Sequence, residues 1–183
     1  SEGITSTQVD RICKRYLHTK KIGHIGTLDP FASGLLPIAM NGATKLIQYF
    51  KWTNIKTYVF EIQFGIQTNT GDSTGIVINT SSIIPTLDEV KQILYNFIGN
   101  IQQIPHIFSA KKINGKKSYE LARCGIVPNI KPKTITIYDL KVLGQYNESL
   151  YKFEATVSSG TYIRSLTEDI AKTLGTLGYT KSL

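Results

Sequence analysis

The sequence predicts one α+β domain with a mixed or mainly antiparallel sheet. Segments in which apolar residues alternate with polar ones are interspersed with segments in which apolar residues recur at helical spacing. No regular strand-helix-strand repeat is present, so a fully parallel sheet is not expected. The 183 residues, of which 41% are hydrophobic, suffice for one well-buried core, and no linker or internal repeat divides the chain.

Four segments are predicted to be helical. They cover residues 6–17, the stretch from Thr86 to near Gly99, residues 118–123, and the stretch after Thr161 that stops at Gly175. Thr86 and Glu89 have the spacing of a capping box. The first helix has a basic face and an apolar face, and we expect the apolar face, which includes Cys13, to pack in the core.

Three strands are predicted from period-two alternation, over residues 57–64, 133–143 and 150–158. Residues 109–117 are expected to form a basic loop or hairpin. Residues 23–42, rich in glycine and proline, are predicted to be a loop with short regular pieces. Loops held on a rigid frame often carry binding and catalytic groups.

Nothing in the sequence predicts a membrane protein or a secreted one. No apolar run approaches the ~18 residues that a spanning helix needs, and the first residues lack the pattern of a secretory signal. The sequence starts at Ser1 without Met, so we expect it to begin inside a longer product. Two cysteines, Cys13 and Cys124, are too few for a disulfide framework, which favours a reducing cytoplasmic setting.

The charge of the chain favours a polyanionic partner. The formal net charge is +8 and the pI about 9.4. Residues 1–57 hold eight basic side chains against three acidic ones, and residues 105–133 hold seven against one. Such blocks are either a solvated lysine-rich surface or a binding surface for the phosphates of a nucleic acid.

Asp29 is the candidate for chemistry, in the stretch GTLDP. The three histidines have no metal-ligand spacing, and the chain has no phosphate-binding glycine motif and no GxSxG. We therefore expect no metal and no cofactor. What remains is a carboxylate that acts as nucleophile or base, or one that only ties a turn.

The run GHIGTLDPFASGLLPIAMNGATK at residues 23–45 closely resembles the signature of the TruB family of tRNA pseudouridine synthases, whose catalytic residue is the aspartate of GTLDP. Four further blocks resemble the family in its order: GITS at 3–6, KTYVFEIQFGIQTNTGDSTG at 56–75, IPHIFSAKKINGKKSYELARCG at 104–125 and SSGTYIRSLTEDIAKTLG at 158–175. The resemblance implies the pseudouridine synthase fold, a bent, mainly antiparallel mixed sheet flanked by helices. It also implies that residues 1–183 are the catalytic domain, truncated at both ends, without any C-terminal PUA domain.

The implied activity is the isomerisation of a uridine in the T loop of tRNA, position 55, to pseudouridine, by base flipping and without a cofactor. Asp29 would be the nucleophile, and Arg164 would pair with it and keep it anionic. Tyr58 would stack on the flipped base, although it would also suit the first core position of a strand. His24 would help to displace and replace the flipped nucleotide.

Other positions follow from the same resemblance. Tyr162 and Leu183 would line the uridine pocket. The residues expected to meet RNA phosphates are Lys45, Lys111, Lys112 and Lys116. His106 stands where the family commonly has a second proline after Pro105, and the resemblance gives it no catalytic role.

Two other functions remain open from the residues themselves. One is an RNA-binding or tRNA-folding module without turnover, which needs the basic blocks but not Asp29. The other is a small-molecule enzyme with a hydrolytic aspartate, for which no water-activating partner is visible. The protein is expected to act as a monomer on the T arm of tRNA.

Overall fold

The computed structural model describes residues 2–49, 55–109, 111–113, 115–126 and 128–183. The chain divides into two compact units, residues 1–54 together with Leu183, and residues 55–182. That residues 1–183 make up one catalytic domain stays a prediction.

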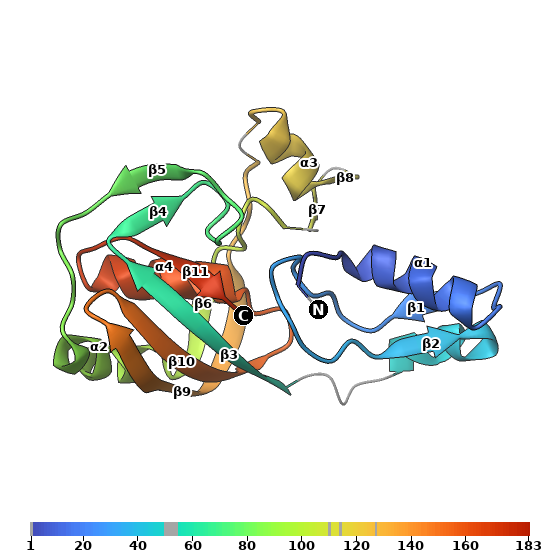
Figure 1. The fold of residues 1–183 in the computed structure, drawn as a ribbon, viewed down its shortest axis with the longest axis horizontal. Helices are drawn as coiled ribbons and strands as arrows, with labels where there is room; N and C mark the ends of the chain where they lie inside the picture. The colour runs from blue at the N-terminus through green and yellow to red at the C-terminus, as the bar shows by residue number, and fades with distance from the viewer. Residues whose placement is uncertain (1, 50–54, 110, 114, 127) are drawn as a thin grey trace. The chain divides into compact units, whose positions relative to one another are not determined.

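The first unit contains helix α1 (Ser6–Tyr16), strands β1 (Ile22–His24) and β2 (Ile38–Met40), and the 3-10 helix η1 (Asn41–Tyr49) (Figure 1). Thr5 caps α1: its hydroxyl accepts the Gln8 backbone N–H at 3.2 Å, and the Gln8 side chain accepts the Thr5 backbone N–H at 2.7 Å. The two strands pair antiparallel. The predicted helix and the short regular pieces within residues 23–42 are confirmed.

The expectation that the apolar face of α1 is core was wrong. Tyr16 is 77% exposed, Leu17 54% and Ile12 39%, and Cys13 is only half-buried. The unit offers two three-residue strands as a packing surface. So small an assembly cannot cover a whole helix face.

The second unit is built on a five-stranded sheet in the order β11-β3-β10-β9-β6, and every neighbouring pair is antiparallel. The strands are β3 (Ile55–Phe64), β6 (Gly99–Gln103), β9 (Lys133–Asn147), β10 (Leu150–Ser158) and β11 (Gly178–Ser182). Two further pairs are antiparallel, β4 (Ile66–Thr68) with β5 (Val77–Thr80), and β7 (Lys112–Ile113) with β8 (Lys116–Lys117). The predicted α+β, mainly antiparallel class is confirmed.

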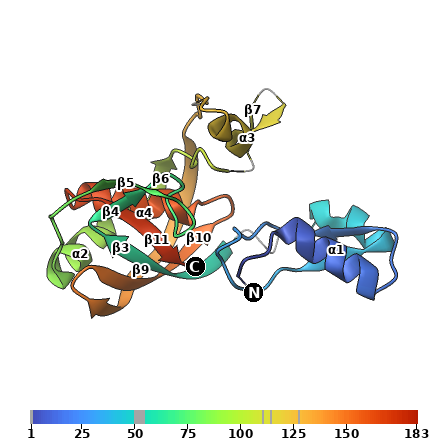
Figure 2. The same cartoon turned by 45° about the horizontal axis from the view of Figure 1, so that its top comes forward.

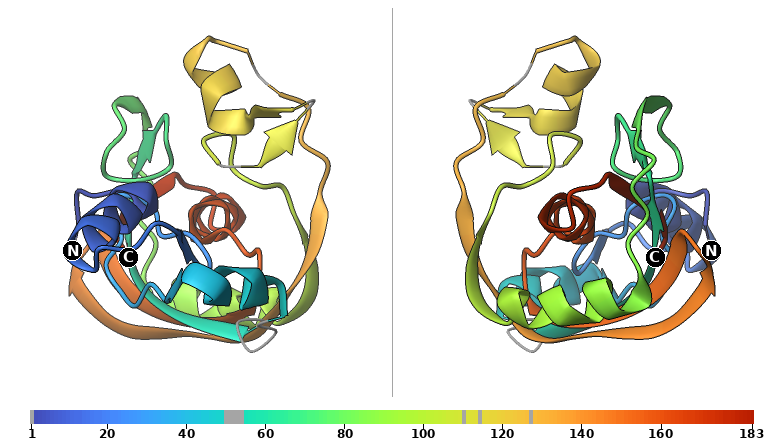
Figure 3. Two further views of the ribbon diagram at one scale, coloured as in Figure 1. Left: turned by 90° about the vertical axis from the view of Figure 1, so that its right-hand side faces the viewer. Right: turned by 90° about the vertical axis from the view of Figure 1, so that its left-hand side faces the viewer.

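The core of this unit lies between the sheet and helix α4 (Ile163–Thr173), around which the strands curve (Figure 3). Phe60 of β3 and Phe153 of β10 are register partners and stack with ring centroids 5.5 Å apart. Both rings are fully buried. Burial of a side chain of this size contributes about 1.5–3 kcal/mol.

The remaining helices of the second unit are short. Thr86 caps α2 (Leu87–Leu94) with the expected capping box, and η3 (Tyr95–Phe97) follows it. The basic segment leaves the sheet after β6, forms the β7–β8 hairpin and α3 (Ser118–Arg123), and returns at β9 (Figures 1 and 2). In the described part of the chain no helix has the length and apolar character needed to cross a membrane.

Candidate active site

Asp29 lies half-buried in the turn-rich segment between β1 and β2. Its carbonyl accepts the Ala32 N–H at 2.9 Å, and the Leu28 N–H donates to the Ser6 hydroxyl at 3.1 Å. The Gly3 N–H donates to the Pro30 carbonyl at 2.7 Å. The start of the chain and the start of α1 thus anchor the backbone on both sides of Asp29.

His24, at the end of β1, is held by a carboxylate that the sequence did not reveal. Its Nδ1 lies 2.7 Å from Oδ2 of Asp10 on α1, and both side chains are mostly buried. A carboxylate at this distance accepts the Nδ1 proton, so Nε2 is the atom left to contact a ligand. The other oxygen of Asp10, Oδ1, is buried without a hydrogen-bond partner.

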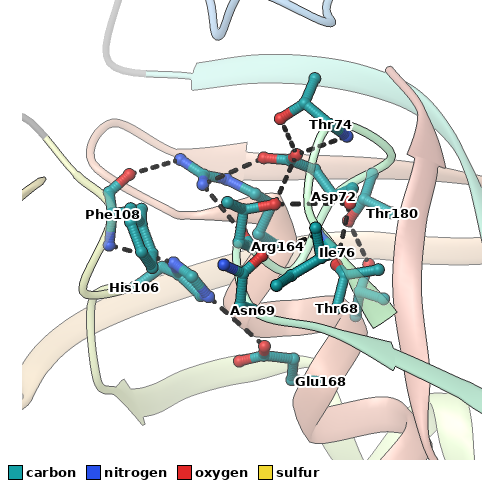
Figure 4. A network of polar contacts seen from close by, with 12 residues as sticks. Thr68, Asn69, Asp72, Thr74, Ile76, His106, Phe108, Arg164, Glu168 and Thr180 are labelled. Atoms are coloured by element: carbon teal, nitrogen blue, oxygen red, sulfur yellow. Dashed lines mark hydrogen bonds and ion pairs between the residues drawn. The ribbon is translucent and has the colours of Figure 1, made fainter. Parts of the chain in front are cut away.

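Arg164, on the first turn of α4, is 5% exposed and is surrounded by hydrogen-bond acceptors (Figure 4). Its Nη1 donates to the Thr70 carbonyl at 3.0 Å and to Oδ2 of Asp72 at 3.2 Å. Its Nη2 donates to the Phe108 carbonyl at 2.9 Å. A guanidinium held at both ends of its fork keeps a fixed direction.

Asp72, which the sequence analysis did not single out, is the carboxylate of this network (Figure 4). It is 4% exposed, and its Oδ1 accepts from the Thr74 N–H at 3.0 Å and from the hydroxyls of Thr70 and Thr74 at 2.8 and 2.6 Å. Thr68 donates to its backbone carbonyl at 2.8 Å. The spacing Thr70, Asp72, Thr74 is a turn signal that could have identified this carboxylate.

The two tyrosines expected in the uridine pocket both lie in the second unit. Tyr58, on β3, is half-buried and continues the row of Phe60 and Phe64, which are fully buried. Tyr162 is the half-buried N-cap residue of α4. Its backbone N–H and carbonyl bond the amide of Gln103 at 2.8 and 3.1 Å, which fixes where α4 begins.

The other predicted positions are spread over both units. Lys45 is exposed on η1, and Leu183 groups with the first unit, where its carbonyl accepts the Ser33 N–H at 2.8 Å. Lys111 donates to the Lys131 carbonyl at 3.4 Å, and Lys116 is exposed on β8. The side chain of Lys112 lies outside the described part. The roles of all these residues stay predictions.

One carboxyl near the network has a shifted pKa. Burial, together with the charge of the neighbouring Glu168, raises the pKa of Asp169, on α4, to about 6. Among the described residues, no three His, Cys, Asp or Glu side chains are grouped so that they could hold a metal ion.

Comparison with known proteins finds similarity to pseudouridine synthases. Residues 14–163 match the family described as "TruB family pseudouridylate synthase (N terminal domain)". Proteins named tRNA pseudouridine synthase B are similar: that of Rickettsia africae is 48% identical over 178 residues, 97% of this chain and 51% of its own length, and that of Rickettsia akari is 46% identical over 179 residues, 97% and 61%. The chain thus spans about half to three fifths of these relatives.

Solved structures give the same result for the fold. A Cbf5-Nop10-Gar1 complex contains a chain 28% identical to this one, with a TM-score of 0.73 over 100% of this chain and 44% of that one. An H/ACA RNP bound to a substrate RNA containing 2'-deoxyuridine has a chain 26% identical, with a TM-score of 0.69 over 99% and 43%. The predicted fold and the family resemblance are confirmed.

Proposed function

We propose, because this chain belongs to the TruB family of pseudouridylate synthases, that it carries the catalytic residues of an enzyme that isomerises a uridine of tRNA to pseudouridine. The observation that carries the proposal is the GTLDP aspartate, Asp29, within the matched residues 14–163. In this reaction the bond from the ribose C1' to N1 of the base breaks, and a bond from C1' to C5 forms. C5 loses a proton and N1 gains one, so no oxidant or cofactor is consumed.

The target is proposed to be the uridine at position 55 in the T loop. A stacked base is out of reach, so it must be flipped out of the RNA at a cost of a few kcal/mol. Stacking on an aromatic face such as that of Tyr58 offsets about 1–3 kcal/mol of that cost. His24, fixed through its Nδ1 by Asp10, presents Nε2 to the displaced nucleotide.

Asp29 is the proposed nucleophile, and its anchored backbone supports that role, because a reacting group must keep its orientation. Arg164 is proposed to stabilise negative charge during the reaction, and the network that holds it supports this. Tyr162 and Leu183 are proposed to line the uridine pocket.

The basic blocks are proposed to bind the tRNA backbone. Their positive charges would neutralise phosphates, so the affinity for tRNA should fall as the salt concentration rises. The residues assigned to this role are Lys45, Lys111, Lys112 and Lys116. We further propose that residues 1–183 form the catalytic domain, and that the protein works as a monomer in the cytoplasm.

The test is pseudouridine formation on an unmodified tRNA transcript by wild type and Asp29→Asn, with tRNA binding measured in the same samples. We expect product from wild type alone, with binding kept in both. Asp88→Asn is the matched control, because Asp88 is an exposed carboxylate on α2 and its change alters the net charge equally. A transcript with cytidine at position 55 should give no product.

If wild type and Asp29→Asn both bind tRNA and neither forms pseudouridine, the protein acts on RNA without this chemistry. Equal product from both would show that Asp29 is not the nucleophile. Pseudouridine formed in the transcript with cytidine at position 55 would show that the target uridine lies elsewhere in the tRNA.

A further inference from the structure

His106 is a buried histidine in the segment between β6 and β7 that the proposed reaction does not use (Figure 4). Its Nδ1 accepts the Phe108 backbone N–H at 3.2 Å, and its Nε2 lies 3.4 Å from Oε1 of Glu168 on α4. A backbone N–H can only donate, so the ring proton is on Nε2 and faces the Glu168 carboxylate. The bond from Nδ1 to the second following residue reproduces that of an Asx turn.

The turn that His106 holds serves Arg164 on one side and the basic hairpin on the other. The Phe108 carbonyl accepts from Nη2 of Arg164 at 2.9 Å. The carbonyls before and after it accept from the base of α3: Ile107 from the Ser118 hydroxyl, and Ser109 from the Tyr119 N–H at 3.1 Å. Three consecutive carbonyls therefore alternate between the two structures, and a rotation of this turn would disturb both.

The imidazole also packs against the residue that precedes Asp72. Gly71 has φ +67°, and a Cβ there would lie 2.9 Å from Nε2 of His106 and 3.1 Å from Oε1 of Glu168. The ring thus lies against the turn that supplies Asp72 and Thr70 to Arg164, and it also holds the turn that supplies the Phe108 carbonyl. No other histidine among the described residues is as buried.

We propose that His106 is a positioning residue for Arg164, which it holds through the backbone of Phe108 and through the turn at Gly71. The inference rests on the proposed function for its effect on turnover. The direction of the guanidinium depends on two backbone turns, and one side chain fixes both. A displacement of about 1 Å at a reacting group lowers turnover by up to a hundredfold.

Three substitutions separate the two contacts of the ring. His106→Asn keeps an acceptor oxygen for the Phe108 N–H, as in an Asx turn, but loses the contact with Glu168. His106→Gln keeps a donor toward Glu168 and loses the local acceptor. His106→Ala loses both. The matched control is His18→Asn, because His18 is exposed and has φ +45°, a conformation that asparagine tolerates.

The first measurement is kcat and KM for an unmodified tRNA transcript in the full-length protein. We expect His106→Ala to lower kcat by about tenfold to a hundredfold with little change in KM, since its effect is on orientation and not on RNA affinity. His106→Asn should recover most of the lost kcat and His106→Gln should not. The inference would be overturned if the three His106 variants had the same kcat as one another, or if they differed from wild type only in KM.

The second measurement needs no turnover. Nitrogen-15 NMR of wild type should find the His106 proton on Nε2, and the Arg164 guanidinium N–H groups should exchange slowly with water. Fast Arg164 exchange is expected in His106→Ala and slow exchange in His106→Asn. A proton on Nδ1 alone, or an Arg164 exchange rate that is the same in wild type and in the His106 variants, would refute the positioning role even if wild type proved inactive. An inactive wild type with the expected spectra would refute only the proposed function.

Discussion

Asp72 gives the sharpest test of the buried network, because its carboxylate accepts hydrogen bonds from hydroxyls and a backbone N–H of its own turn and from a guanidinium on α4. Oδ1 accepts from Thr70 and twice from Thr74, and Oδ2 accepts from Nη1 of Arg164. The side chains of Asp72 and Arg164 are 5% and 6% exposed. Asp72→Ala would therefore remove a buried anionic partner of the guanidinium, together with the carboxylate oxygen that accepts from Thr70 and Thr74.

The expected loss in the free energy of unfolding follows from that burial. Removal of one partner of a buried ion pair costs about 3–5 kcal/mol, because the other charge stays buried after it has lost that partner. Asp72→Asn keeps an oxygen for Thr70 and Thr74 but turns an amide donor toward a cation. A buried donor without an acceptor costs about 1–3 kcal/mol, so the loss should be smaller than for Asp72→Ala.

Urea unfolding of the variants, followed by far-UV circular dichroism, measures both values from the transition midpoint and its slope. Asp139→Ala is the control: Asp139 is 56% exposed, lies 3.6 Å from Lys141, and should contribute less than about 1 kcal/mol. If Asp72→Ala lost no more stability than this control, the network would not be the buried ion pair described above.

Two further predictions concern other carboxylates. Asp10→Ala should free the His24 imidazole and lower kcat for pseudouridine formation more than Asp10→Asn, which keeps an acceptor for Nδ1–H. Glu2→Gln changes an exposed charge in the same unit and should match wild type. A kcat that Asp10→Ala leaves unchanged would contradict the pairing of Asp10 with His24. For Asp169, whose pKa burial raises from 3.8 to about 6, the folded state holds the proton more tightly than the unfolded state, so its stabilising contribution is present below pH 3.8 and lost as the pH rises through about 6. The stability of Asp169→Asn relative to wild type should therefore rise across that pH range, to about 1 kcal/mol at neutral pH after allowance for the partial exposure of the carboxyl. Urea midpoints of both proteins below pH 3.8 and above pH 6 measure this gain. A stability difference that does not change with pH would refute the prediction.

The elements that the sequence predicted are those set by local signals. Thr5 and Thr86 cap their helices together with a residue three positions later, so a stretch of four residues is enough to recognise each cap in the sequence. The alternation along residues 57–64 and 150–158 likewise indicated two strands, whereas their pairing, with Phe60 opposite Phe153, is visible only in the structure. β6 and β11 were not predicted: the first carries two adjacent glutamines, and the second only five residues with a glycine, so neither has a strong alternation.

The candidate site divides in the same way. Asp29, Arg164 and Tyr58 could be named because each stands in a block that resembles the family, whereas their supports could not. Arg164 and Asp72 are 92 residues apart, and Asp10 lies 14 residues before His24. A pattern of residue types does not say which distant side chains the fold brings together.

His106 makes the limit of family resemblance concrete. At a position where proline is common, a histidine looks like a loop substitution without consequence, since proline would fix the same backbone through its ring. In this chain the imidazole fixes the backbone by a hydrogen bond to Phe108 and reaches Glu168 as well. A substitution that departs from the family can therefore retain the local geometry while it adds a contact to α4, and only the contacts of the folded chain reveal which part of the turn it supports.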